Sequence, residues 1–120
     1  MRLTRRSSLA ALAALLTRTA RAEAEAGTGL LAPGTRFSTP WFRVVGDEPG
    51  PTVAIIAGIH GNETAPPAAA DLLTRSHLRR GSLWVVPEAN RPALAATSRF
   101  TPNARSSNLN RNFPTSCSPP

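Results

Sequence analysis

The stretch T-V-A-I-I-A-G-I-H-G-N-E, residues 52–63, decides the fold class of this 120-residue chain. Its first half, 52–57, is apolar, rich in β-branched residues and too short for a helix, which predicts a strand buried on both faces. A helix is expected next, because Thr64 can cap it, two prolines fit its first turn and residues 68–73 propagate it. The stretch S-L-W-V-V at 82–86 predicts a second buried strand. This strand–helix–strand order indicates a parallel pair with a right-handed crossover, and hence an α/β fold.

The flanking segments predict further extended structure. Residues 27–40 are rich in Gly, Pro and Thr and are interpreted as an extended lead-in. The stretch W-F-R-V-V at 41–45 predicts a strand, and G-D-E-P-G-P at 46–51 predicts a turn after it. Beyond Ala89 the chain becomes polar, with many asparagines and serines and no internal repeat.

Residues 1–26 are expected to be a targeting segment rather than part of the fold. An arginine-containing start precedes a short apolar run at 9–16, and three small-x-small sites follow between 20 and 26. This order is typical of a secretory signal peptide, and the run is too short for a stable membrane anchor. The stretch T-R-R-S-S-L at 4–9 resembles a twin-arginine export signal, which predicts the bacterial periplasm. A basic amphipathic helix or a mitochondrial presequence is the alternative, since two more arginines interrupt the tail.

Composition excludes several classes of protein. All fourteen basic residues are arginine, against seven acidic residues, for a net charge of +7. Without residues 1–26, nine arginines and five acidic residues remain, a net charge of +4 with no basic run, so no nucleic-acid partner is expected. An apolar content of 41% excludes a wholly disordered chain. The single cysteine, Cys117, excludes an internal disulfide framework and a cysteine-rich zinc module.

The first chemical motif is His60-x-x-Glu63, at the carboxyl end of the first predicted buried strand. Open α/β sheets place their ligand sites at this end. Imidazole and carboxylate suit zinc, and flanking glycines at 58 and 61 allow the backbone to bend so that both side chains converge. The alternative is that His60 forms a loop hydrogen bond and Glu63 adds charge at the helix start.

The second motif is N-L-N-R-N-F-P at 108–114. An arginine such as Arg111 grips a carboxylate with two hydrogen bonds, and the neighbouring Asn110 adds donors without repelling the anion. The alternative is a solvated, asparagine-rich turn with Phe113 packed against the core.

Three stretches together resemble a known family: G-I-H-G-N-E at 58–63, W-V-V-P-E-A-N at 84–90 and N-L-N-R-N-F-P at 108–114. Their order is similar to that in the zinc carboxypeptidase superfamily, and most similar to its succinylglutamate desuccinylase/aspartoacylase branch. The resemblance implies a three-layer α/β/α fold with a mixed, partly parallel sheet. It also implies a hydrolase with Zn²⁺ as cofactor, acting on an amide or peptide that carries a free carboxylate.

The resemblance also implies roles for individual residues. His60 and Glu63 match the first two zinc ligands, and Asn110 and Arg111 match the pair that binds the substrate's carboxylate. Arg99 resembles the arginine that polarises the scissile carbonyl and stabilises its oxyanion. Arg105 competes for that role, and a plain surface charge is the alternative for Arg99. By analogy, zinc would activate a water and a glutamate would serve as general base.

The chain departs from the family pattern in its second half. The pattern needs a third zinc ligand, a histidine, and a catalytic glutamate downstream of the Asn-Arg pair, and neither follows. His77 and Glu88 precede that pair and do not replace them. Residues 27–120 are therefore interpreted as the N-terminal part of a catalytic domain, truncated and inactive as given, with an irregular tail at 115–120. We expect the isolated segment to bind zinc weakly and to aggregate.

Two functions remain open for the parent protein. The absence of an N-P-D-G-type segment after Val86 favours a deacylase of N-acyl amino acids. The export signal favours a metallocarboxypeptidase acting on cell-wall peptides. A non-catalytic truncated fragment is the third interpretation, and the sequence specifies no oligomeric state.

Overall fold

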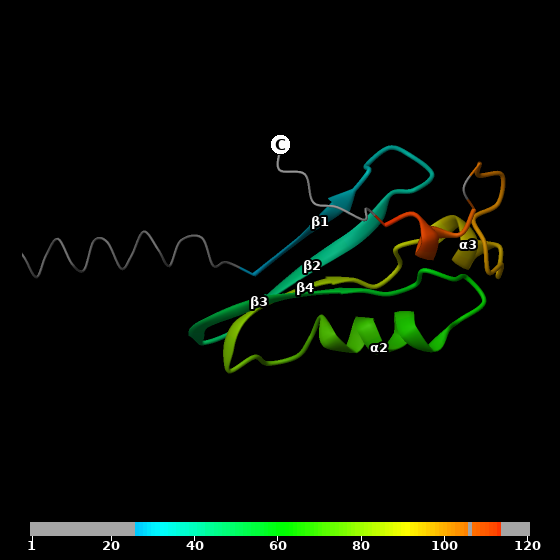
Figure 1. Ribbon diagram of the computed structural model, residues 1–120. Helices are drawn as coiled ribbons and strands as arrows, with labels where there is room; N and C mark the ends of the chain where they lie inside the picture. The colour runs from blue at the N-terminus through cyan, green and yellow to red at the C-terminus, as the bar shows by residue number, and fades with distance from the viewer. Residues whose placement is uncertain (1–25, 106, 114–120) are drawn as a thin grey trace, which may run out of the picture.

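The computed structural model describes residues 26–105 and 107–113. The signal peptide predicted for residues 1–26 (Ala26 apart) and the tail expected at 115–120 lie outside this part of the chain. The described residues form a mixed four-stranded sheet with two α-helices and a 3-10 helix (Figure 1). The elements are β1 (Gly27–Leu31), β2 (Thr39–Val45), β3 (Glu48–Ile56), α2 (Ala65–Leu73), β4 (Arg80–Val86), α3 (Arg91–Ala95) and η1 (Leu109–Arg111).

The strand order is β1-β2-β4-β3. β1 and β2 pair antiparallel, as do β2 and β4. β3 and β4 pair parallel, with Thr52 opposite Ser82 and Ile56 opposite Val86. α2 connects them, so the parallel strand–helix–strand unit expected from the sequence is confirmed.

Strand β3 differs from the expectation in two ways. It begins at Glu48, inside the segment 46–51 for which the sequence predicts a turn, and its register is irregular between Glu48 and Thr52. It is also an outer strand, with Val53 51% and Ile56 46% exposed, so burial on both faces is wrong for this strand. The reason is that β4 takes the inner position, and the prolines of β3 are tolerated at a sheet edge because they need donate no ladder hydrogen bond there.

Two elements go beyond the sequence expectation, which had the segment of β1 as an extended lead-in and that of α3 only as polar. β1 lies in the segment 27–40, where it pairs with β2 from Gly27 opposite Arg43 to Leu31 opposite Thr39. α3 follows Asn90, with a proline in its first turn, in a region that looks only polar and irregular. Five residues in each element are too few to produce a recognisable periodicity.

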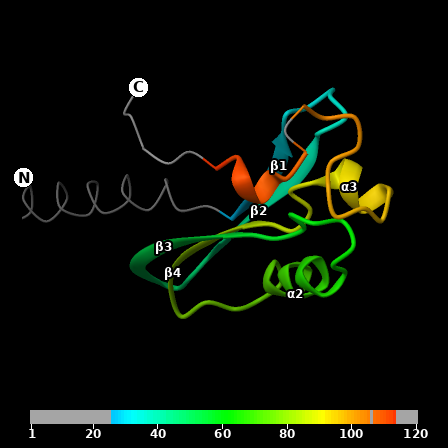
Figure 2. The same ribbon diagram turned by 45° about the vertical axis from the view of Figure 1, so that its right-hand side comes forward.

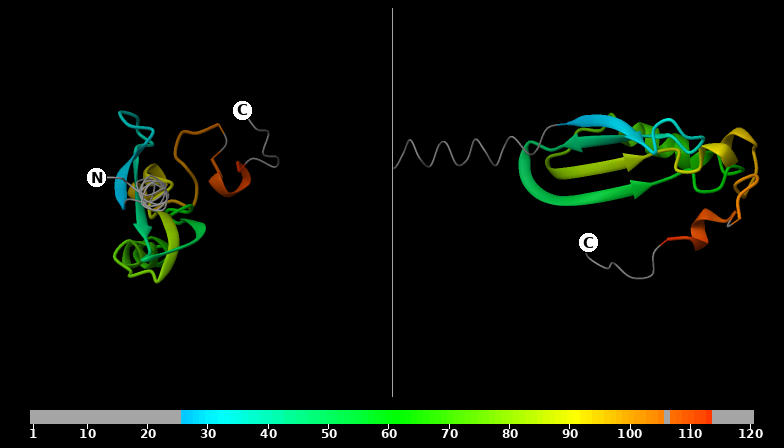
Figure 3. Two further views of the ribbon diagram at one scale, coloured as in Figure 1. Left: turned by 90° about the vertical axis from the view of Figure 1, so that its left-hand side faces the viewer. Right: turned by 90° about the horizontal axis from the view of Figure 1, so that it is seen from above.

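Helix α2 covers one face of the sheet, as Figure 3 shows in the view along the strands. Thr64 occupies the N-cap position and prolines occupy the first turn, as expected, although the Thr64 side chain makes no capping hydrogen bond. The core under α2 consists of the buried Ala57, Ala70, Leu83 and Val85, with Phe42, Val44, Ile55, Leu73 and Leu78 partly buried around them. No helix in the described part of the chain is long and apolar enough to cross a bilayer.

The opposite face of the sheet carries an aromatic pair. Side chains alternate along a strand, so Trp84 points away from the core that Leu83 and Val85 enter. Its ring centroid lies 4.9 Å from that of Trp41, and the Arg43 guanidinium lies 5.4 Å from the Trp84 centroid. Among the described helices, only α2 packs extensively on the sheet. Sheet plus α2 therefore make up two layers of the expected three-layer fold.

Replacing Val85 with alanine is expected to destabilise the domain by about 2 kcal/mol. Val85 is fully buried, so the substitution removes methyl groups from the core and leaves a cavity. Urea denaturation measures the loss of unfolding free energy. Leu72→Ala on α2 is the matched control, because Leu72 is 70% exposed and its loss should change stability by less than about 0.5 kcal/mol. Equal losses in both variants would mean that the core does not lie beneath α2.

Candidate functional site

His60 and Glu63 meet in the loop between β3 and α2. His60 is 7% exposed, and its Nδ1 lies 3.0 Å from Oε1 of Glu63. The backbone N–H of Glu63 donates to the carbonyl of His60, which tightens the turn between them. The Glu63 side chain remains 45% exposed. One buried imidazole and one solvent-facing carboxylate therefore converge at the carboxyl end of β3.

Backbone hydrogen bonds fix where this loop starts. The ladder of β3 and β4 continues beyond the strand ends, because Ala89 N–H donates to Ala57 and Asn90 N–H donates to Gly58, each at 2.9 Å. Gly58 has a φ of +66°, and a Cβ there would lie 2.7 Å from the carbonyl oxygen of Pro87. Only glycine fits this turn, which directs the chain from the strand toward His60.

Arg99 joins the pair from a loop that is distant in sequence. Its Nη1 donates to the same Glu63 Oε1 at 3.0 Å, and its side chain is 49% exposed. The loop is held in place by the backbone N–H of Gly61, which donates to Ser98 at 2.8 Å. Of the two arginines that compete for the carbonyl-polarising role, Arg99 is the one at the His60–Glu63 pair. Arg105 makes no hydrogen bond or ion pair with another described residue.

Asn108 also belongs to this neighbourhood, although sequence reasoning missed it. Its Oδ1 accepts a hydrogen bond from the backbone N–H of Asn110 at 3.2 Å and lies 3.3 Å from His60 Nε2. A backbone N–H only donates, so this Asn108 atom is the amide oxygen, and His60 Nε2 is placed to donate a hydrogen bond to it. The position of Asn108 at the start of the motif 108–114 was the sequence feature that could have identified it.

The donor set fits part of a zinc site. In the tautomer that carries its proton on Nε2, His60 offers Nδ1 as a ligand atom, beside a carboxylate oxygen of Glu63. These are two members of a His₂Glu set, and the hydrogen bond to Asn108 is the kind of outer contact that orients a ligating histidine. The described residues contain no cluster of three such ligands.

Asn110 and Arg111 lie on η1, which the bond between Asn108 and His60 holds beside the site. Both residues are exposed. The Arg111 side chain makes no hydrogen bond or ion pair with another described residue. Figure 2 shows η1 after the long loop that leaves α3. The structure thus brings together His60, Glu63 and Arg99, whereas the Asn110 and Arg111 side chains form no hydrogen bond or ion pair with these three in the described part of the chain.

The other titratable candidates have different partners. His77 Nε2 lies 3.2 Å from Asp47 Oδ2. This exposed pair joins the connection between α2 and β4 to the connection between β2 and β3. Glu88 lies 3.2 Å from Arg91. Neither His77 nor Glu88 forms a hydrogen bond or ion pair with His60 or Glu63 in the described part of the chain.

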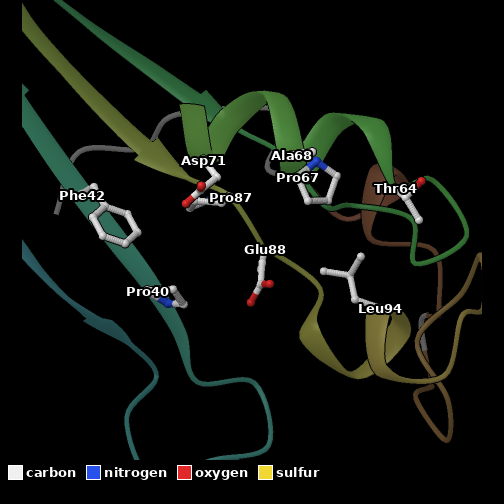
Figure 4. A pocket seen from close by; sticks show the side chains of 9 residues that line it. All are labelled: Pro40, Phe42, Thr64, Pro67, Ala68, Asp71, Pro87, Glu88 and Leu94. Carbon is white, nitrogen blue, oxygen red and sulfur yellow. The ribbon is translucent and has the colours of Figure 1, made fainter. Parts of the chain in front are cut away.

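A cavity of about 490 Å³ lies beside the site but does not contain it (Figure 4). It opens between α2, the start of β2 and the end of β4. Its walls are Pro40, Phe42, Thr64, Pro67, Ala68, Asp71, Pro87, Glu88 and Leu94. Because His60, Glu63 and Arg99 are not among them, the cavity does not define the candidate site.

Comparison with protein families finds one match. The succinylglutamate desuccinylase/aspartoacylase catalytic domain matches residues 49–119. This range contains His60, Glu63, Arg99, Asn110 and Arg111. No curated protein matches the chain.

Several solved structures are similar to this chain. An aspartoacylase family protein from Mesorhizobium loti is 35% identical with a TM-score of 0.66, over 76% of this chain and 31% of that one. The product-bound ectoine utilization protein EutE from Ruegeria pomeroyi is 32% identical with a TM-score of 0.62, over 74% and 30%. A succinylglutamate desuccinylase from Silicibacter sp. is 30% identical with a TM-score of 0.62, also over 74% and 30%. The chain thus spans about 30% of the length of these structures.

Proposed function

The chain belongs to the succinylglutamate desuccinylase/aspartoacylase family, and on that premise we propose that its protein is a zinc-dependent hydrolase of an amide bond next to a free carboxylate. The family is zinc-dependent. The observation that carries the proposal is the convergence of His60 Nδ1, Glu63 Oε1 and Arg99 Nη1 within 3.0 Å contacts at the carboxyl end of β3.

His60 and Glu63 would hold the metal, with a third ligand from outside the described residues. Bound zinc supplies Lewis acidity and an acidified water. With its proton on Nε2, His60 would donate to Asn108 and leave Nδ1 available as the metal ligand. Arg99 lies beside Glu63, so its guanidinium would be available to a substrate carbonyl bound there and would stabilise the developing negative charge.

Asn110 and Arg111 supply substrate binding in this proposal. Arg111 is exposed and without a partner among the described residues, so it is available for a carboxylate, and Asn110 adds neutral donors. The relatives include a succinylglutamate desuccinylase, which supports an N-acyl amino acid as the substrate class. A third, helical layer over Trp41 and Trp84 would complete the proposed α/β/α fold.

The proposed location is the bacterial periplasm, reached by twin-arginine export and without a stable membrane anchor. The order of basic start, apolar run and small-x-small sites in residues 1–26 supports it. Fusion of residues 1–26 to a reporter that is active only after folded export tests this step. Replacing Arg5 and Arg6 with lysine should abolish export, whereas export that survives the double substitution points to the general route.

The hydrolase proposal is tested on the purified full-length protein. N-acetylaspartate, N-succinylglutamate and short peptides with a free C-terminus form the substrate panel. Cleavage should disappear on chelation and return on addition of zinc. Activity that survives thorough removal of zinc contradicts the proposal.

A metallocarboxypeptidase acting on cell-wall peptides is the second candidate, favoured by the signal-like N-terminus. Cleavage of peptides in preference to N-acyl amino acids supports it. The third candidate is a non-catalytic fragment. The genomic sequence beyond the codon for Pro120 distinguishes it, since a hydrolase requires a downstream histidine and glutamate there.

Arg111→Lys is expected to raise KM for an N-acyl amino acid about tenfold with little change in kcat. Lysine keeps the charge but loses the two-pronged hydrogen bonding to a carboxylate, a difference of about 1.5 kcal/mol or more. Steady-state kinetics with the N-acyl amino acid identified from the substrate panel measures KM and kcat. Arg105→Lys is the control and should leave KM unchanged, because Arg105 lies outside the motif 108–114 proposed to bind the carboxylate and, unlike Arg99, makes no hydrogen bond to Glu63. An equal rise in KM for both variants would remove Arg111 from the carboxylate subsite.

A further inference from the structure

The side chain of Asn90 does not cap helix α3, although its position at the start of the helix favours a capping hydrogen bond. Asn90 is the N-cap residue of α3, where asparagine commonly accepts a hydrogen bond from the helix's own N–H groups. Here its side chain makes no capping bond and is 3% exposed. Its Nδ2 instead donates to the carbonyl of Ile59 at 3.0 Å, and its Oδ1 accepts from the hydroxyl of Thr101, also at 3.0 Å.

These contacts are unambiguous in direction. A carbonyl oxygen only accepts, so the atom facing Ile59 is the amide nitrogen and the atom facing Thr101 is the oxygen. Thr101 is 7% exposed, so the hydroxyl and the carboxamide meet away from water. Removal of either partner leaves a buried polar group unsatisfied.

The Asn90–Thr101 pair touches every segment of the candidate site. Ile59 immediately precedes His60, and Thr101 lies two residues after Arg99. The backbone N–H of Thr101 donates to Ser107 at 2.8 Å, and Ser107 precedes the residue that binds His60 Nε2. One buried pair therefore links the loop of the zinc ligands, the loop of Arg99 and the entry to η1.

We propose that Asn90 and Thr101 are positioning residues that set the relative placement of the His60–Glu63 pair, Arg99 and η1. This inference rests on the proposed function, since it concerns how the same site is held ready for metal and substrate. Neither residue contacts the reacting atoms. They act through Ile59 and Ser107, which carry their neighbours His60 and Asn108 to within 3.3 Å of each other. Hydrogen bonds between buried polar groups rigidify a structure and favour one geometry.

The test measures zinc affinity with a competing chelator in the full-length protein and in its Thr101→Val, Thr101→Ser and Asn90→Ala variants. Thr101→Val keeps the shape of the side chain and removes only its hydroxyl. It should weaken zinc binding about tenfold, the lower end of what loss of contacts outside the ligand shell costs. Asn90→Ala, which removes both contacts, should weaken it at least as much. Thr101→Ser restores the hydroxyl and should stay within about twofold of the native affinity.

A second pair separates this role from stability alone. Thr52 and Ser82 share a hydroxyl–hydroxyl bond of 2.9 Å between β3 and β4, and Ser82 is 8% exposed. Ser82→Ala should therefore lower the melting temperature without changing zinc affinity. If Ser82→Ala weakens zinc binding as much as Thr101→Val, or if Thr101→Val leaves it unchanged, the proposal is overturned.

A measurement made without metal distinguishes the positioning role of Asn90 and Thr101 from the proposed hydrolase function. At one fixed pH, the imidazole ¹⁵N resonances of His60 report its bond to Asn108, and His77→Gln assigns them. They should move in Asn90→Ala and Thr101→Val and stay in place in Ser82→Ala. If the native full-length protein binds no zinc, the proposed function fails, while these resonances still decide the positioning role.

Discussion

Replacing His60 with alanine is expected to reduce the zinc affinity of the full-length protein by more than about a hundredfold. Loss of a residue outside the ligand shell already costs ten- to a hundredfold, and His60 is itself one of only two ligands available in the described residues. Glu63 would keep its ion pair with Arg99 at 3.0 Å, so the remaining carboxylate is also neutralised by a cation. Competition with a chelator measures the change.

The second histidine provides the control. The chain contains two histidines, and His77 lies in an exposed pair with Asp47, away from Glu63. His77→Ala should therefore leave zinc affinity within about twofold of the native value, since exposed pairs contribute little. A comparable loss in His77→Ala would show that zinc binds elsewhere, and the assignment of His60 would be wrong.

Replacing Gly61 with alanine is expected to destabilise the domain by about 3 kcal/mol or more. A Cβ at this position would overlap the carbonyl carbon and oxygen of Ala93 and press on the backbone of Leu94. These are backbone atoms of α3, so no side chain can rotate out of the way, and overpacking of this kind is among the more costly substitutions. Urea denaturation and the melting temperature measure the loss.

Gly34→Ala is the matched control for the effect of adding a methyl group to a glycine. Gly34 has a φ of +77° and no atom within 4 Å of the position its Cβ would take. Its cost is therefore limited to the backbone conformation, about 1–2 kcal/mol. A smaller loss for Gly61→Ala than for Gly34→Ala would contradict the close packing of α3 against the His60 loop.

Local signals explain how much of the fold could be predicted. An apolar, β-branched run, a proline-led helix and a second apolar run each act over fewer than ten residues, and they identified β3, α2, β4 and the parallel pairing. β1 could not be predicted, because its glycine-rich sequence becomes a strand only by pairing with β2. The exposure of β3 could not be predicted either, because its place at the edge depends on the strand order and not on its own residues.

At the candidate site, too, contacts between residues close in sequence could be predicted from spacing, whereas contacts between distant residues could not. His60 and Glu63 are three residues apart, so their spacing alone predicts that they meet. Arg99 was selected through a resemblance, and the structure places it on Glu63 across 36 residues. Asn108, Asn90 and Thr101 were missed, because an asparagine or threonine in a polar segment looks like a turn residue until its partner is known.

The number of residues between two contacting side chains also determines the order in which the contacts of the site form during folding. The contact between His60 and Glu63 closes a loop of three residues, whereas that between His60 and Asn108 closes one of 48. Short loops close with less loss of entropy, and contacts between distant segments limit folding rates. We therefore expect the two metal ligands to meet while the chain is still largely unstructured, and Arg99 and η1 to dock later. During refolding, metal capture would thus precede assembly of the substrate-binding side of the site.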